Sequence, residues 1–370
     1  MKKLVAMVLA MALAFSLAAC GGSDGSSAAA GGSSAAAGGS SAGGAAAGSS
    51  GKIAVIRQLA NSDHTTQFFA GCIAEGEALG YTVDTFTADG DDVKMQDLME
   101  QALQKDYDIW IVSHANEGYQ YDLVSRAVEK GVKVVGFDCG GEHVEGVTYT
   151  SQDDEALASI SLDGLIAGAK EKGASEPVKF LEINVLGFIV PFDTRHASIE
   201  QYVADGKLEV AQIISPKTSG GDTYSEIYTA VSTALAQDTN KEIHGIWAAS
   251  SGYLDGAVAA LQDSGRDDVV LSAVDISDTE IKRLVDVPDY VSCAAVDPYV
   301  IGMVDVRLAV LKTLGVETPE TYALDAVLVT GKDLTAEDTM QTLNKYFADF
   351  GSTDAFDTDE IKALREKFAK

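Results

Sequence analysis

Residues 53–80 read IAVIRQLANSDHTTQFFAGCIAEGEALG, and the pattern of this stretch is the basis for predicting the rest of the fold. Its apolar start at 53–56 predicts a buried strand, which ends in the polar pair Arg57-Gln58. A turn-rich loop follows, and apolar residues then recur at helical spacing until Gly80 stops the run. The stretch is therefore the first half of a βαβ unit. Ligands of open parallel sheets bind beyond the carboxyl ends of the strands, so we expect residues 58–69 to form one wall of a binding crevice.

The rest of the chain repeats this alternation of short apolar strands and helices. Further strands are predicted at 82–86, 109–112, 132–137, 147–149, 178–183, 208–214, 243–248, 269–274, 291–296 and 326–329. Helices are predicted at 92–104, 117–130, 154–172, 192–204, 222–237, 253–264, 279–285, 298–314, 336–347 and 359–368. Near-continuous apolar strands between helices indicate parallel sheets that are covered on both faces. Two such series predict an α/β fold of two doubly wound parallel-sheet lobes.

Residues 1–19 have the pattern of a signal peptide. Lys2 and Lys3 make the start positive, and residues 4–19 are apolar but short for a membrane span. The tetrapeptide LAAC at 17–20 resembles a bacterial lipobox, which implies cleavage before Cys20 and attachment of lipid to its sulfur. Such an anchor would hold the protein on the extracytoplasmic face of the cell membrane without spanning it. The alternative is an ordinary signal peptide or membrane anchor with a cysteine there by chance.

Residues 20–51 predict a tether. They are almost wholly Gly, Ser and Ala, with Asp24 as the lone charge. This composition cannot bury apolar area, so we expect disorder. A Gly/Ser chain of this length has a root-mean-square reach of about 30 Å, which would let the folded part move above the membrane.

Charge and cysteine spacing exclude several classes of function. The chain has 27 Lys and Arg against 56 Asp and Glu, a formal net charge of −29, so nucleic acid is not an expected partner. Cys72, Cys139 and Cys293 are widely spaced and lack the spacing of a structural zinc site. Dinucleotide, phosphate-cradling and nucleophile-elbow motifs are missing from the sequence. We therefore predict no cofactor, no metal and no catalytic residue, and we expect Cys72 and Cys293 to be buried apolar residues.

Five stretches, taken in order, carry a family resemblance. They read FFAG at 68–71 with ALGY at 78–81, KGVKVVGFD at 130–138, GIWAAS at 245–250 with DGA at 255–257, VD at 274–275, and DPY at 297–299 with IG at 301–302. Together they resemble the type I periplasmic-binding-protein family, in its ribose-like sugar-binding branch, over about residues 52–330.

The resemblance implies two lobes joined by a three-crossover hinge that closes on a ligand. The crossovers would lie near 151–154, 296–298 and 324–327. The N-terminal lobe would hold 52–152 and 297–325, the C-terminal lobe 153–296 and 326–332, and a helical extension 333–370. Members of the family deliver a small molecule to the membrane subunits of an ABC importer or to a sensor. We expect a monomer with a sugar-like ligand.

Two strand ends supply acidic candidates for the binding site. Asp138 and Asp275 each end an apolar strand, where a carboxylate accepts hydrogen bonds from neighbouring sugar hydroxyls. Either residue could instead cap a following helix. Typical ribose-like binders have Arg directly after the first of these Asp residues, whereas this chain has Cys139.

The other candidates are aromatic, basic or polar. In sugar binders of the family, adjacent aromatics stack on the apolar face of the ring, so we expect Phe68 or Phe69 to face the cleft. The alternative is that both pack in the core. Arg195 could clamp hydroxyls or a carboxylate, or could pair with Glu200 or Asp193. The remaining candidates lie at strand ends, in loops or at a crossover, where Asp297 could also be only a helix cap: Gln58, Asp63, His64, His114, Phe188, Ser250 and Asp297.

The favoured function is a lipid-anchored extracytoplasmic solute-binding protein that passes a neutral monosaccharide, or a sugar-like molecule, to an ABC importer. A polyol, a nucleoside or a furanone-like signalling sugar stays open as the ligand. The alternatives are a ligand sensor for a signalling receptor and an exported carbohydrate-active enzyme, with Asp138 and Asp275 as acid and base. The fold by itself does not separate these classes.

Overall fold

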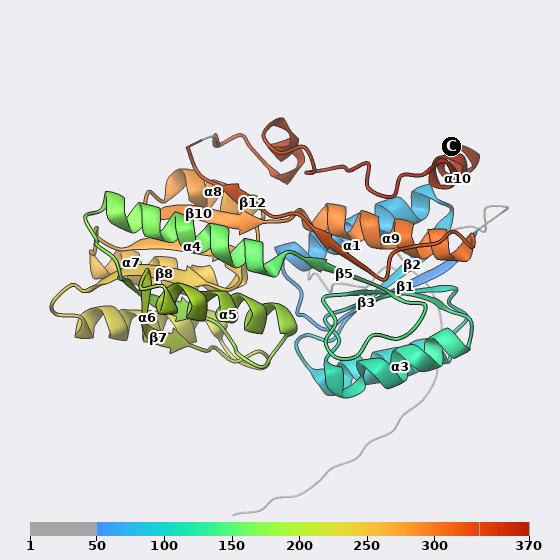
Figure 1. The fold of residues 1–370 in the computed structure, drawn as a ribbon, viewed down its shortest axis with the longest axis horizontal. Helices are drawn as coiled ribbons and strands as arrows, with labels where there is room; N and C mark the ends of the chain where they lie inside the picture. Colours follow the sequence, from blue (N-terminus) through green and yellow to red (C-terminus); the bar gives the residue numbers. More distant parts are fainter. Residues whose placement is uncertain (1–49, 333, 370) are drawn as a thin grey trace, which may run out of the picture. The chain divides into compact units, whose positions relative to one another are not determined.

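The computed structural model of the chain describes residues 50–332 and 334–369. The predicted signal peptide, Cys20 and most of the predicted tether lie outside these residues. The described part forms two lobes, each built on one six-stranded sheet (Figure 1).

The first lobe is built on a parallel sheet. Its strand order is β11 (Thr321–Leu324), β5 (Thr148–Gln152), β4 (Lys133–Phe137), β3 (Ile109–Ser113), β1 (Gly51–Arg57) and β2 (Tyr81–Thr87). Side chains alternate across a strand, so Ile53 and Val55 pack on one face and Ala54 and Ile56 on the other. The first face is covered by α1 (Asp63–Ala78) and α9 (Pro298–Thr313), the second by α2 (Asp92–Leu103) and α3 (Glu117–Glu129).

The second lobe repeats this plan. Its strand order is β12 (Val327–Val329), β10 (Tyr290–Ala295), β9 (Val270–Val274), β8 (Ile243–Ala248), β6 (Val178–Ile183) and β7 (Leu208–Ile214), and only β12 runs antiparallel among the described strands. One face carries α4 (Asp154–Glu171) and α5 (Val190–Ala204). The other carries α6 (Thr223–Gln237), α7 (Leu254–Ser264) and α8 (Asp278–Asp286). The short 3-10 helix η1 (Ser251–Tyr253) directly precedes α7.

The chain passes between the lobes three times. β5 of the first sheet leads into α4 of the second lobe, β10 of the second sheet leads into α9 of the first, and β11 leads into β12. The predicted fold class, two doubly wound lobes joined by a three-crossover hinge, is therefore confirmed. Cys72 and Cys293 are fully buried, as expected.

Two glycines let α1 and α9 approach closely. A Cβ on Gly71 would lie 2.0 Å from the carbonyl oxygen of Tyr299, and a Cβ on Gly302 would lie 2.4 Å from that of Phe68. Neither position leaves room for a side chain. The close approach fixes α1 against α9, and the loop that leads from β1 into α1 reaches the cleft.

Two elements differ from the predictions. β11 was not predicted, because its residues alternate between exposed and buried at the sheet edge and form no apolar run. The helix predicted at 336–347 is instead a 3-10 helix, η2 (Met340–Lys345), whereas α10 (Asp359–Phe368) forms as predicted. Polar side chains compete with the backbone there: Asp338 accepts from the Thr335 amide, and Thr339 and Thr342 form a capping box. The segment after β12 is therefore only partly helical.

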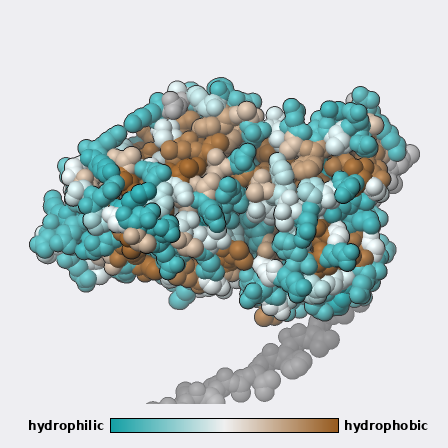
Figure 2. Space-filling view, in the orientation of Figure 1, coloured by the Kyte–Doolittle hydropathy of each residue, from teal (hydrophilic) through white to brown (hydrophobic). Residues whose placement is uncertain are grey.

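Hydrophilic residues cover much of the face seen in Figure 2, with hydrophobic patches between them. Among the described residues, no helix is both long and apolar enough to cross a bilayer.

Candidate functional site

Three strands are each followed directly by a residue whose backbone dihedrals lie in the left-handed region. His114 follows β3 with φ 62°, Asp138 follows β4 with φ 49°, and Asp275 follows β9 with φ 76°. This region is unfavourable for residues other than glycine, and such residues concentrate at functional sites. All three side chains are nevertheless buried, with 4%, 6% and 7% of their surface exposed. The carboxyl ends of both sheets therefore hold polar side chains in strained, fixed positions.

Arg57, the last residue of β1, supplies a buried cation at the same carboxyl-end edge of the first sheet as His114 and Asp138. Its guanidinium donates from Nε to the Thr65 hydroxyl at 3.1 Å and from Nη1 to the Ser113 hydroxyl at 2.8 Å, and Nη2 lies 3.0 Å from His64 Nδ1. The guanidinium also lies 4.9 Å from the ring centroid of Phe68. Burial lowers the pKa of Arg57 to about 10, against the opposing effect of Asp138 and Asp275, so it stays charged at neutral pH.

Arg195 of α5 supplies a second buried cation. Its Nε donates to Oδ1 of Asp154 at 2.8 Å, and its Nη2 lies 3.8 Å from Oδ1 of Asp275. Oδ2 of Asp275 accepts from the Ser250 hydroxyl at 2.7 Å. Only 2% of the Arg195 surface is exposed. The carboxylates of Asp154 in α4 and of Asp275, just after β9, are therefore both held against one buried guanidinium.

The two histidines of the site are neutral. Burial lowers the pKa of His64 to about 4 and moves that of His114 well below its usual range, where nearby Arg57 lowers it further. Nε2 of His114 lies 3.5 Å from Oδ2 of Asp138. Burial, followed by the charge of Asp154, raises the pKa of Asp138 well above its usual range.

The buried arginine, histidine and aspartate side chains described above surround two adjoining cavities. One has a volume of about 60 Å³ and takes its lining from both lobes: Arg57, Leu59, Ser62, His64, His114, Gln152, Ile189, Pro191, Phe192, Arg195, Ser250 and Asp275. The other, of about 450 Å³, shares Gln152 and Pro191 with it and adds Asp138 and Asp154. The carboxyl ends of the two sheets thus face one polar cleft, which narrows between the lobes.

Several buried polar atoms of this region have no hydrogen-bond partner among the described residues. They are both amide atoms of Gln58, Oε1 of Gln152 and Oδ2 of Asp138. A buried polar atom without a partner costs about 1–3 kcal/mol, and such atoms are rare in native structures. Gln152 and Asp138 line the cavities, where a bound ligand with hydroxyl groups would satisfy their free atoms, whereas Gln58 lines neither cavity.

The sequence places the chain in a family. Residues 53–315 match the periplasmic binding protein domain. A solved sugar ABC transporter protein from Yersinia enterocolitica subsp. enterocolitica 8081 has 31% sequence identity and a TM-score of 0.78, over 86% of this chain and 95% of that one. The chain belongs to the periplasmic binding protein family. Within it, the chain falls in the ribose-like branch of type I proteins, with the solute-binding proteins of sugar ABC transporters.

More distant structures share the fold. The 5-methylthioribose transporter solute-binding protein of Thermotoga lettingae TMO, solved with 5-methylthioribose, has 22% identity and a TM-score of 0.76 over 85% of this chain and 97% of that one. A carbohydrate transporter solute-binding protein from Agrobacterium radiobacter, solved with D-arabinose, has 18% identity and a TM-score of 0.68 over 76% and 95%. Among curated proteins, none matches the chain.

The structure of this periplasmic binding protein brings six of the twelve predicted site residues to the two cavities. One set lines the smaller cavity: His64, His114, Arg195, Ser250 and Asp275. Asp138 lines the adjoining cavity. Asp275 is not a helix cap, because Ser277 caps α8. Arg195 pairs with Asp154 rather than with Glu200 or Asp193, because α4 brings Asp154 to it across the lobe.

Other predicted residues lie elsewhere in the binding protein. Phe68 is fully buried and stacks on Phe137 beneath Arg57, and Phe69 and Phe188 are partly buried against the core. Asp63 is exposed, and its carboxylate accepts from the Thr279 hydroxyl of the second lobe at 3.0 Å. Asp297 is the helix cap that was the alternative to ligand binding. Its Oδ1 accepts from the Tyr299 amide at 2.9 Å, and it lines a different cavity.

Sequence reasoning missed Arg57, Gln152 and Asp154 in the binding protein. Arg57 ends the first apolar strand beside Gln58, so the position of its neighbour could have identified it. Asp154 resembled an ordinary acidic residue in the first turn of α4, and Gln152 resembled a strand residue. Among the described residues, no group of three or more His, Cys, Asp or Glu side chains could hold a metal ion.

Proposed function

We propose that this protein is a lipid-anchored receptor that binds a neutral monosaccharide, or a small polyhydroxylated molecule of similar size, and delivers it to an ABC importer. The ligand lies in the cleft between the two lobes. The lobes separate to admit it to the part of the cleft where Arg57, Arg195 and Asp275 meet, because that cavity has a volume of only about 60 Å³ and a cavity that holds benzene has roughly 150 Å³.

The observation that carries the proposal is the set of polar groups around the cleft. Carboxylates of Asp138, Asp154 and Asp275 accept hydrogen bonds, and the guanidiniums of Arg57 and Arg195 donate them. A sugar hydroxyl both donates and accepts, so a ring with several hydroxyls can satisfy groups of either kind. Two guanidiniums face three carboxyl groups, and burial raises the pKa of Asp138 well above its usual range, so the charges nearly balance, which favours a ligand without net charge.

The solved relatives support a small polyhydroxylated ligand, since further binding proteins of this fold hold glycerol, allitol and D-allose. The Yersinia protein is described as part of a sugar ABC transporter, and the Thermotoga and Agrobacterium proteins hold 5-methylthioribose and D-arabinose. Ribose-like rings present several hydroxyls on a compact frame. The unpartnered Oε1 of Gln152, which lines both cavities, offers an acceptor to such a ring.

The test is to identify what the protein retains. The full chain is purified from its native source without added sugar, and released small molecules are identified by mass spectrometry, with an Asp275→Ala variant purified in parallel. We expect a neutral sugar or polyol from the wild type and much less from the variant. An acidic or basic compound retained by the wild type would contradict the proposed ligand class.

The same sample separates the receptor from the exported enzyme. The identified sugar is incubated with the protein and recovered, and a receptor returns it unchanged. Conversion would favour catalysis by the cleft carboxylates. Delivery is tested by uptake of the radiolabelled sugar, which should be lost from cells lacking the protein; unchanged uptake would contradict the importer role.

A further inference from the structure

The C-terminal segment runs from one lobe to the other (Figure 1), and we call residues 334–369 the strap. Its first half is fixed to the second lobe. The side chains of Met340, Leu343 and Phe350 are buried in the apolar core beside α8 and β10. The amide of Met340 also donates to Oδ1 of Asp278, the first residue of α8, at 2.7 Å. This half must therefore move with the second lobe.

The second half of the strap is fixed to the first lobe. Arg307 of α9 donates from Nη1 to the carbonyl oxygens of Thr353 at 2.7 Å and Ala355 at 2.9 Å. Glu75 of α1 lies 2.8 Å from Nε of Arg307 and 2.7 Å from Nη2 of Arg365 in the strap. Arg307 and Glu75 are almost fully buried, with 3% and 4% of their surface exposed. Arg365 of the strap is 34% exposed, so the costlier strap contacts to break are the two carbonyl hydrogen bonds, whose loss would leave the buried Arg307 guanidinium without those partners.

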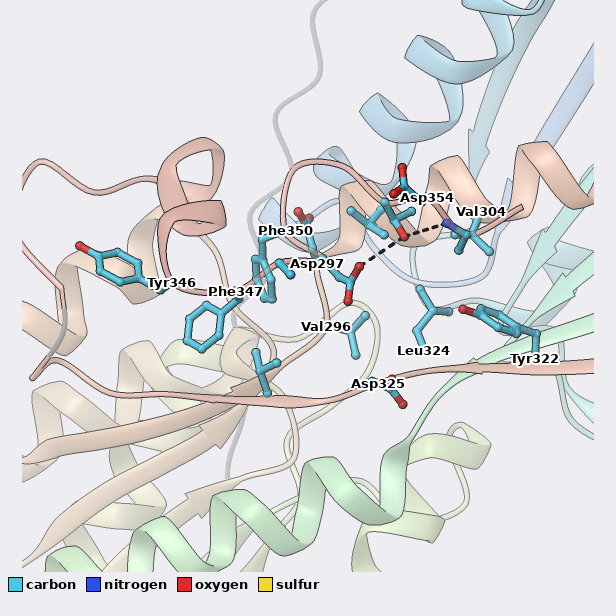
Figure 3. Close-up of a pocket in the computed structure, with 16 residues that line it drawn as sticks. Val296, Asp297, Val304, Tyr322, Leu324, Asp325, Tyr346, Phe347, Phe350 and Asp354 are labelled. Atoms are coloured by element: carbon cyan, nitrogen blue, oxygen red, sulfur yellow. Dashed lines mark hydrogen bonds between the residues drawn. The ribbon is translucent and has the colours of Figure 1, made fainter. Parts of the chain in front are cut away.

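Between its two ends the strap touches the hinge. Gly351 donates from its amide to Oδ2 of Asp297 at 2.6 Å, and Asp297 lies on the crossover from β10 to α9. Figure 3 shows residues that line a cavity between the strap and the hinge region, with Phe347 and Phe350 of the strap toward one side, Leu324 and Tyr322 toward the other, and Asp297 next to Phe350. The cavity has a volume of about 480 Å³. The strap thus crosses the hinge with space beneath it, held at one point by Asp297.

The fixed points on the two lobes are close together in the chain. Phe350 belongs to the core of the second lobe, and the carbonyl of Thr353 is bonded to the first lobe. Three residues of extended chain span at most about 11 Å, so these two points cannot lie farther apart than that unless a contact breaks. We propose that the strap is a fourth connection between the lobes and limits how far the ligand cleft opens. This role does not depend on which ligand the cleft binds.

The first test lengthens the strap without removing its contacts. A short Gly-Ser insert is placed between Ser352 and Thr353, and the matched control carries the same insert directly after Lys332, where it does not lengthen the span between the lobes. Spin labels at Val93 of α2 and Val203 of α5, which are 68% and 41% exposed, report the distance between the lobes in ligand-free protein. Labelling uses a Cys20→Ser, Cys139→Ser background, because Cys72 and Cys293 are fully buried.

We expect the distance distribution of the first insert variant to broaden and shift by several ångströms, while the control matches the wild-type distribution. Unchanged distances in the first variant, or an equal change in both variants, would overturn the proposal. Thermal melts identify any insert variant that fails to fold.

A second test uses point variants that keep the length of the chain. Asp297→Asn retains an oxygen to cap α9 but cannot also accept from Gly351, because its second atom is an amide donor. Asp349→Asn makes the same charge change at an exposed position of the same cavity. We expect broader distances between the lobes only in Asp297→Asn. Identical distributions in the two variants would refute a role for the strap at the hinge.

Discussion

The guanidinium of Arg195 donates from Nε to Oδ1 of Asp154 at 2.8 Å, and its Nη2 lies 2.8 Å from the same oxygen. The pair joins the start of α5 to the start of α4, which is the element that enters the second lobe from the hinge. Arg195 also donates to the carbonyl of Ala249 at the end of β8. One buried guanidinium therefore connects three elements that border the cleft, and it determines where Asp154 and Asp275 lie.

Replacing Arg195 by Met should destabilise the protein strongly. Asp154 would lose its main counter-charge while staying buried, and removal of one partner from a buried pair costs about 3–5 kcal/mol of unfolding free energy. Urea denaturation measures this. The control is Arg126→Met, which removes an exposed arginine paired with Glu100 and should have a much smaller effect. Equal stability of Arg195→Met and wild type would show that the pair does not hold the site together.

Replacing Asp138 or Asp275 by Ala should weaken binding of the identified sugar. A carboxylate that accepts from hydroxyls in a largely dry cleft contributes about 2–4 kcal/mol, or roughly 30- to 1000-fold in affinity. Isothermal titration calorimetry checks the affinity, and Asp349→Ala serves as an exposed acidic control. Full affinity in either cleft variant would remove that carboxylate from the ligand site.

Replacing Gln58 by Met should affect stability and binding in opposite directions. Both amide atoms of Gln58 are buried without partners among the described residues, so an apolar side chain of similar size should leave stability unchanged or raise it. Binding should weaken, because we expect the amide to reach the ligand once the lobes separate, although it lines neither cavity in this structure. Thermal melts and calorimetry measure the two effects.

The matched control for Gln58 is Asn184→Leu. The Asn184 amide is also buried, but it donates to Glu182 at 2.9 Å and to the carbonyl of Phe192 at 3.1 Å. Its replacement should cost about 1–3 kcal/mol of stability, because the partners left behind are buried. A Gln58→Met variant destabilised as much as this control would mean that Gln58 has a partner in the ligand-free protein.

Asp305 should make stability depend on pH. Burial raises its pKa from the ordinary 3.8 to about 8, and the Thr150 hydroxyl donates to its Oδ1 at 2.7 Å. Between these two pKa values the folded state holds a proton that the unfolded state has released. The free energy of unfolding therefore falls as pH rises from about 4 to about 8, by at most about 1.4 kcal/mol per pH unit.

The Asp305→Asn variant removes this titration. Its stability relative to wild type should increase with pH over the same window, measured by urea denaturation at several pH values. Asp349→Asn, at an exposed position, should show no such trend. A constant difference between Asp305→Asn and wild type across the window would contradict the raised pKa.

Membrane attachment should depend on Cys20. Lipid on its sulfur would supply the anchor, so Cys20→Ala should release the protein from the membrane or leave an uncleaved precursor. Fractionation and mass spectrometry of the mature chain measure this, with Cys139→Ala as the control. A lipid-modified Cys20→Ala protein would show that the anchor lies elsewhere.

The strands and helices follow from local pattern, and most of them were predicted to within a few residues. Apolar runs such as Val178–Ile183 mark buried strands, because both faces of a doubly wound sheet are covered. β11 lacked this signal because it lies at a sheet edge, and η2 departed from prediction because polar side chains captured the backbone. Local pattern thus predicts strands and helices correctly where both faces of an element are buried, and it fails at the edge of a sheet and in the C-terminal segment.

Hydrophobic periodicity and the order of motifs were enough to predict the fold class, the family and the strand ends that face the cleft, since both are properties of neighbouring residues. Three contacts are seen only in the folded chain: Arg195 pairs with Asp154, Phe68 lies beneath Arg57, and the strap reaches Asp297. These contacts join residues far apart in the chain. Their partners are selected by packing and by the cost of burying an unpaired charge, which no local stretch of sequence records.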